Sequence, residues 1–151
     1  MTYAWERRCL QAAILLAGFV PVMAGAAGVL FGVSIVSGFS ENRILDSHFH
    51  YLSGLLLGIG LVFWCLIPGI ERQGKIFRAM TALVVLGGLG RLFDMIVHGL
   101  LSPGMIAALG MELVITPILF FAQSHLAARF LKQRLPEIQG QELRSVGIPT
   151  G

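Results

Sequence analysis

Three ionisable side chains lie inside one of the longest apolar stretches of the chain, GLGRLFDMIVHG (88–99). Arg91, Asp94 and His98 are spaced i, i+3 and i+7, so a helix would place them on one side. An arginine, a carboxylate and an imidazole on one stripe can form ion pairs, move protons or bind a small polar ligand. Ionisable groups inside an apolar helix are by default hypotheses for a functional site. This stripe is the first candidate site.

A carboxylate at matching depth follows on the next apolar stretch. The turn LSPG (101–104) reverses the chain, with Arg91 about ten residues before it and Glu112 about ten after it. At about 1.5 Å per residue, both lie roughly 12–15 Å from that end of the helices. A charge at such a depth in a bilayer costs about 2.5–3.5 kcal/mol, and pairing with an opposite charge offsets that cost. We therefore predict an Arg91–Glu112 ion pair, with Thr116 on the helix face of Glu112.

A second polar group stands at the start of an earlier apolar stretch, where the chain reads HFHY. His48 and His50 would be about 160° apart on a helix, so at most one can face inward together with Tyr51. These residues have nearly the same depth as His98. We expect one inward cluster with Asp94 and His98, around a cavity that water or a lipid headgroup can enter.

Three interpretations of these groups stay open: a structural network that locks the helices together, a polar pocket for a small molecule or headgroup, and a metal or haem site. The residues that a metal site would use are His48, His50, His98, Asp94 and Glu112. No HxxxH or ExxH pair on one helix supports such a site, so we predict neither a metal nor a cofactor. GxGxxG, P-loop and GxSxG motifs are absent, and no nucleophile is identified. Enzymatic activity is not predicted by any motif.

Composition defines the elements that must position these residues. Of 151 residues, 56% are hydrophobic and 13% are charged, whereas soluble domains have about 25% charged residues. Four stretches reach the roughly 20 residues that cross a hydrocarbon core of about 30 Å, and none shows the alternation of a membrane β-barrel. We predict an all-α, integral membrane four-helix bundle in a single domain (1–127) with a basic tail (128–151). Its helices are expected at about 10–36, 48–68, 77–100 and 104–127.

Basic residues predict the orientation of this bundle. Nine of the eleven lysines and arginines flank one set of helix ends, and Arg43 alone lies in the connections at the other set. By the positive-inside rule, both termini are expected on the cytoplasmic side of the membrane, which we expect to be a bacterial inner membrane. The first stretch runs beyond the 7–15 apolar residues of a signal peptide, so we expect it to remain as a helix. The net charge of +3 is interpreted as topology and contact with anionic membrane lipid, and no nucleic-acid partner is predicted.

Small residues predict where helix backbones approach one another. Two GxxxG pairs occur, Gly28 with Gly32 and Gly54 with Gly58. Such pairs allow close helix packing in membranes, either within the bundle or in contact with a partner subunit or second copy. In the stretch 77–100, Gly87 is expected to share the face of Arg91, Asp94 and His98, and Gly90 is expected to widen this small-and-polar face. Asp46 or Ser47 is expected to cap the start of helix 2.

Three short motifs resemble a known bacterial family of four-helix membrane proteins. They are YLSGLLLGIGLVFW (51–64), VLGGLGRLF (85–93) and MELVITP (111–117). The family is known as domain of unknown function 4345, and the resemblance covers about residues 10–127. Its matched polar positions are Tyr51, Ser53, Arg91 and Glu112. Asp94 and His98 fall outside the pattern, and His50 occupies a position where the resemblance implies an arginine, which weakens a metal or proton-relay site at these residues.

The sequence therefore predicts a multi-pass membrane protein with a polar interior at Arg91 and Glu112. We expect it to bind a small ligand, a lipid or a partner subunit without enzymatic activity. The alternative is a membrane enzyme, quinone- or metal-linked, that uses the cluster of His, Asp and Glu side chains in the outer half. A bound metal, quinone or lipid in the purified protein would distinguish the two.

Overall fold

The computed structural model describes residues 2–35, 43–99 and 102–145. Its elements are helices of different kinds, and the described residues form no strand. In order they are α1 (Tyr3–Phe31), the 3₁₀ turn η1 (Gly32–Ile35), α2 (Arg43–Leu66), the 3₁₀ turn η2 (Ile67–Gly69), α3 (Gly74–His98), α4 (Pro103–Gly110), the π-helical segment η3 (Met111–Ile115) and α5 (Thr116–Ser145).

The predicted four-helix architecture is confirmed. Four segments are long and apolar enough to cross a membrane: Tyr3–Ile35, Arg43–Gly69, Gly74–His98 and Pro103–Pro136. Few residues in their most apolar parts are buried within the chain itself. A helix that stays apolar on its uncovered faces is typical of one that contacts lipid or another subunit.

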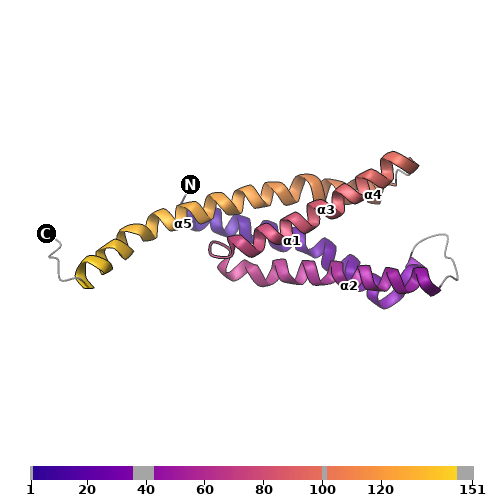
Figure 1. Ribbon diagram of the computed structural model, residues 1–151, viewed down its shortest axis with the longest axis horizontal. Helices are drawn as coiled ribbons and strands as arrows, with labels where there is room; N and C mark the ends of the chain where they lie inside the picture. The colour runs from indigo at the N-terminus through magenta and orange to yellow at the C-terminus, as the bar shows by residue number, and fades with distance from the viewer. Residues whose placement is uncertain (1, 36–42, 100–101, 146–151) are drawn as a thin grey trace.

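The helices are arranged as two antiparallel pairs (Figure 1). α1 packs along α2 over the most extensive interface, and α3 packs along η3 and α5. The two pairs meet at the end that holds the α2–α3 connection, and they separate toward the opposite end. We call the first the basic end (residues 3–9, 67–78 and 125–136) and the second the far end (43–50 and 94–106).

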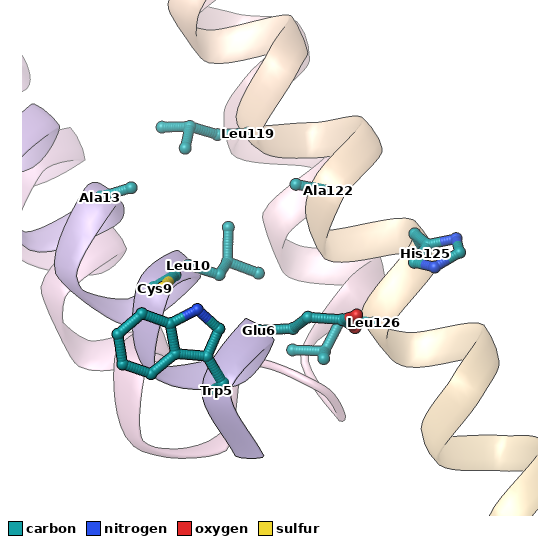
Figure 2. Close-up of a pocket in the computed structure, with 9 residues that line it drawn as sticks. All are labelled: Trp5, Glu6, Cys9, Leu10, Ala13, Leu119, Ala122, His125 and Leu126. Carbon is teal, nitrogen blue, oxygen red and sulfur yellow. The ribbon is translucent and has the colours of Figure 1, made fainter. Parts of the chain in front are cut away.

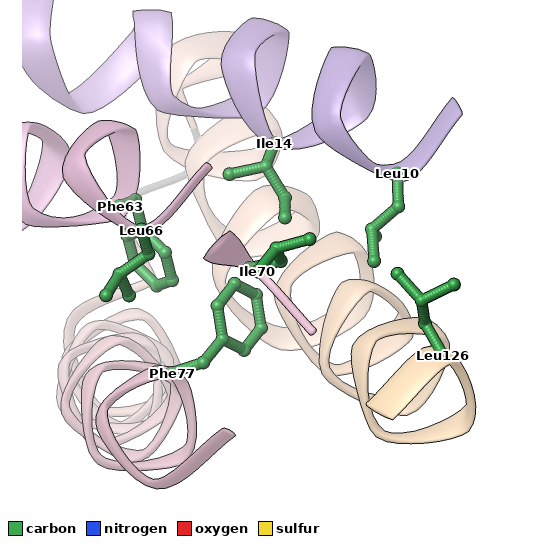
Figure 3. Close-up of a cluster of buried hydrophobic side chains, with 7 residues drawn as sticks. All are labelled: Leu10, Ile14, Phe63, Leu66, Ile70, Phe77 and Leu126. Carbon is green, nitrogen blue, oxygen red and sulfur yellow. The ribbon is translucent and has the colours of Figure 1, made fainter. Parts of the chain in front are cut away.

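A hydrophobic core joins all four long helices at the basic end (Figure 3). Its buried members are Leu10, Ile14, Phe63, Leu66, Ile70, Phe77 and Leu126. The rings of Phe63 and Phe77 meet edge to face with centroids 5.2 Å apart. Gln123, almost fully buried, donates from Nε2 to the Ile70 carbonyl at 2.9 Å. The core and this buried hydrogen bond fix the α2–α3 connection against α5.

Small residues form the seam between α1 and α2. A methyl group added at Gly28 would overlap the side chain of Ser53, and one added at Gly18 would overlap the indole of Trp64. The Trp64 Nε1 donates to the Leu15 carbonyl at 3.1 Å. The seam explains why the α1–α2 pair stays closed along its length while the other interfaces are shorter.

The turn between α3 and α4 uses local signals that the sequence shows. α3 ends at Gly99 in a left-handed conformation with φ +67°, whose N–H donates to the Met95 carbonyl at 2.9 Å. α4 begins with Ser102 as its N-cap, accepting from the Met105 N–H at 3.2 Å, and Pro103 occupies the first position. The described residues on both sides of the predicted LSPG turn thus end one helix and start the next, while Leu101 lies outside the described residues.

The predicted start of helix 2 is wrong. α2 begins at Arg43, so Asp46 and Ser47 lie inside its first turns and do not cap it. The Asp46 carboxylate instead accepts from the Val33 N–H at 2.9 Å, at the end of α1. α5 also continues to Ser145, and its last turns project beyond the other helices (Figure 1). The predicted basic tail thus begins as part of this helix.

Candidate functional site

Arg91 and Glu112 lie face to face between α3 and η3. The Arg91 Nε donates to Glu112 Oε2 at 3.2 Å, and its Nη2 donates to Oε1 at 3.2 Å. This bidentate geometry is the strongest that a guanidinium and a carboxylate can form. The Glu112 side chain is 18% exposed, whereas that of Arg91 is 39% exposed. The pair predicted from matched depth is present, and its arginine is only partly covered by the chain.

Glu112 is held on a π-helical segment that the sequence analysis did not predict. Pro117 has no N–H, and its ring would crowd the Leu113 carbonyl in a regular α-helix. The helix forms a wider π turn here, in which the Thr116 N–H donates to the Met111 carbonyl. The Thr116 hydroxyl donates to the same carbonyl at 2.8 Å. Thr116 therefore shapes the helix that carries Glu112. Such π segments occur frequently at functional sites.

Gly88 allows η3 to approach α3 at this point. A Cβ at Gly88 would lie 2.9 Å from the Glu112 Cβ and 2.8 Å from Leu113 Cδ2. A Cβ at Gly87 or Gly90 would have no neighbour within 4 Å. Gly87 and Gly90 therefore border open space and do not mediate the contact with η3. Gly88, which is buried and lies about one helical turn before Arg91, makes this close approach possible.

Asp94 and His98 form a separate pair on α3. The His98 Nδ1 lies 2.9 Å from Asp94 Oδ1, and the two side chains are 62% and 52% exposed. Their spacing is i,i+4, so this contact forms within one helix. Within the part of the chain that the structure describes, neither residue bonds to α2 or α5.

The polar residues of α2 are also held apart from α3. The His50 Nδ1 lies 2.9 Å from the Asp46 carbonyl oxygen and 3.5 Å from Asp46 Oδ1. The side chains of Asp46 and His50 both lie against Gly32, just after the end of α1, where a Cβ would overlap them. His48 is exposed, and Tyr51 is 65% exposed. His50 thus faces α1, which secures the α1–α2 pair at the far end.

The expected single cluster of His98, Asp94, Tyr51 and one histidine of α2 is not formed in this structure. The physical reason is the separation of the two helix pairs, which is greatest at the far end (Figure 1). Sequence periodicity predicts which residues share a helix face, and it contains no information on how far the facing helix stands. Among the described residues, no group of three or more His, Cys, Asp or Glu side chains could hold a metal ion. The alternative enzyme would need these groups together.

Polar contacts at the basic end were missed by the sequence analysis. Arg129 Nη1 lies 2.6 and 2.5 Å from the two carboxylate oxygens of Glu6, and Arg7 Nε donates to Glu71 at 3.1 Å. Both pairs join segments that are far apart in the chain. The sequence does show a single acidic residue, Glu6 or Glu71, among several basic residues at each of two positions. This pattern does not indicate which basic residue each carboxylate pairs with.

Comparison with known proteins identifies the family of the chain, and the matched range includes the ion pair. The family described as a domain of unknown function (DUF4345) matches residues 9–123, which include Arg91, Gly88 and Glu112. No curated protein and no solved structure matches the chain. Because the match covers most of the four membrane-length helices, the chain belongs to the family described as a domain of unknown function, DUF4345.

Proposed function

We propose that the chain is a non-enzymatic multi-pass membrane protein that binds a small ligand, a lipid or a partner subunit at the Arg91–Glu112 pair. The observation that carries this proposal is the partial exposure of Arg91, at 39% of its side chain. Arg91 lies seven residues before the end of α3, about 10 Å along the helix axis. A guanidinium at that depth faces hydrocarbon unless something else covers it.

The charge of Arg91 is costly in a bilayer. An arginine within the span costs about 2.5–3.5 kcal/mol or more when it is not compensated. Glu112 neutralises the charge but leaves donors of the guanidinium open, since Arg91 bonds only through Nε and Nη2 within the described part of the chain. A bound molecule or subunit with acceptor groups at this depth would satisfy them.

One glycine pair remains available for a partner subunit or a second copy. Gly28 and Gly32 pack against α2 within the chain, whereas a Cβ at Gly58 would meet nothing within 4 Å and one at Gly54 only Val29, at 4.0 Å. A small-residue stripe of this kind favours close helix association in membranes. We propose α2, through Gly54 and Gly58, as the surface that a partner subunit would use.

We also propose a bacterial inner membrane as the location, with both termini in the cytoplasm. The basis is the distribution of charge: the basic end contains eight lysines and arginines and two acidic residues, and basic residues stay on the cytoplasmic side during insertion.

The binding proposal is tested with a variant that removes both charges of the pair. Arg91→Met with Glu112→Met leaves no unpaired charge, so the bundle should still form. Native mass spectrometry of protein purified in mild detergent is expected to find a bound molecule, lipid or subunit on the wild type that is missing from this variant. Asp94→Ala with His98→Ala is the matched control and should keep the bound species. Identical composition of the wild type and the Met/Met variant would overturn the proposal.

A further inference from the structure

A pocket of about 430 Å³ opens between α1 and α5 near the basic end (Figure 2). Ala13 on α1 and Ala122 on α5 stand across from each other and contribute only methyl groups, which leaves the space between the helices unfilled. Leu10, Leu119 and Leu126 make most of the remaining wall. A volume of this size lies within the range of ligand pockets, about 300–1,000 Å³.

One end of this pocket carries charged and aromatic groups. The ion pair of Glu6 and Arg129 joins α1 to α5 there, at 2.6 Å and 2.5 Å. Since Arg129 neutralises Glu6, the carboxylate does not oppose an anion. The Arg129 side chain is still 37% exposed, and the exposed His125 and Lys132 follow on the same side of α5 at helical spacing. Trp5, 57% exposed, stands at the margin of the pocket (Figure 2).

The pocket lies at the depth where a phospholipid changes from headgroup to acyl chain. Its lining on α1 runs from Trp5 to Ala13, about 12 Å along the axis, beginning near the end of the span Tyr3–Ile35. An exposed tryptophan is typical of the membrane–water interface. An apolar hollow that leads from hydrocarbon to a basic rim complements an amphiphile with an anionic head.

We propose that this pocket binds an anionic phospholipid, with one acyl chain between Ala13 and Ala122 and the headgroup phosphate at Arg129 and Lys132. The choice of occupant rests on charge complementarity: eight cationic and two acidic residues lie in the segments of the basic end, which attract anionic lipid. The site goes beyond the proposed function, because it lies between other helices and nearer the other end of the bundle than Arg91 and Glu112.

The experiment separates the acyl chain from the headgroup. Delipidated full-length protein in detergent is titrated with phosphatidylglycerol or with phosphatidylcholine of the same acyl chains, and bound lipid is counted by native mass spectrometry. The wild type should bind phosphatidylglycerol at least fivefold more tightly. Ala122→Leu fills the pocket and should abolish this binding. Ala128→Leu, at an exposed position of α5 outside the pocket lining, is the matched control and should not change it.

The charge variant tests the headgroup without altering the pocket. Lys132→Gln should weaken phosphatidylglycerol binding about fivefold and phosphatidylcholine binding less, because the choline of phosphatidylcholine offsets the charge of its phosphate. Lys75→Gln, an exposed lysine in the first turn of α3, should have no such effect. If Ala122→Leu does not fold, the comparison of Lys132→Gln with Lys75→Gln still tests the proposed lipid site.

Three results would overturn the proposal. The first is equal affinity for the two lipids. The second is equal binding by Ala122→Leu and Ala128→Leu, or by Lys132→Gln and Lys75→Gln. The third is a change of oligomeric state on Ala122→Leu with lipid binding intact, which would assign the pocket to a second copy of the chain. Loss of Arg91–Glu112 binding would leave these results unaffected, so the two proposals fail separately.

Discussion

Adding one methyl group at Gly88 tests the contact that holds Arg91 against Glu112. The new Cβ would lie 2.9 Å from the Glu112 Cβ, an atom fixed to the backbone of η3, whereas carbon atoms pack at about 3.5–4.0 Å. η3 must therefore move away from α3 by roughly 0.5 Å or more to accept it. Both Arg91–Glu112 distances are already 3.2 Å, the upper end of normal hydrogen-bond length. The same displacement should break the bidentate geometry.

The magnitude follows from comparison with a neighbouring glycine. Gly87→Ala gains helix propensity of about 0.5–1 kcal/mol and meets no atom within 4 Å. Gly88→Ala has the same gain in propensity but adds an overpacking cost of about 1–3 kcal/mol. The free energy of unfolding should therefore be lower for Gly88→Ala than for Gly87→Ala by about 1–3 kcal/mol.

Reversible unfolding in detergent micelles, followed by circular dichroism, measures this difference between the two variants. Gly90→Ala, also open, provides a second reference. If Gly88→Ala is as stable as Gly87→Ala and Gly90→Ala, then α3 and η3 are not in close contact at Glu112, and the geometry of the site is refuted.

Two further predictions concern the far end and the topology. Asp46→Ala should lower the free energy of unfolding by about 1–3 kcal/mol, because it leaves the backbone N–H of Val33, near the end of α1, without its acceptor. Asp94→Ala removes only a contact between exposed side chains, so it should lower the free energy of unfolding by less than about 1 kcal/mol. Equal losses for the two variants in chemical unfolding would contradict this contrast. Reporter fusions after Gly38 and after Gly140 should report opposite sides of the membrane. One predicted span lies before Gly38 and three lie between Gly38 and Gly140, and the basic residues place both chain ends on the cytoplasmic side. The same side for both fusions would exclude four spans.

The parts of the structure that were predictable from sequence depend on quantities that one helix determines alone. The length of the apolar stretches predicts four spans, and residue rise predicts that Arg91 and Glu112 share a depth. Gly99 and Ser102 carry local signals for the end of one helix and the start of another. Each of these predictions needs only the spacing of residues along the chain.

The parts that were not predictable depend on distances between helices. Periodicity places Asp94 and His98 on one face, but the separation of the helix pairs leaves that face uncovered. Gly88 differs from Gly87 and Gly90 only in the neighbour that it meets. The π segment did have a local signal, since Pro117 follows a threonine whose hydroxyl can reach back along the helix. That signal predicts an irregular helix, but it does not indicate that the irregularity is a π-helical turn.

The double-mutant cycle on Arg91 and Glu112 tests the central claim most directly. Arg91→Met should strand the Glu112 carboxylate, which is 18% exposed, and Glu112→Met should strand the guanidinium. Each loss is expected at about 3–5 kcal/mol, because breaking a buried pair leaves an uncompensated charge. The double variant should lose much less free energy of unfolding than the sum of the two single changes. The same cycle on Asp94 and His98 should show coupling below about 1 kcal/mol. Additive losses at Arg91 and Glu112 would contradict the ion pair and the site built on it.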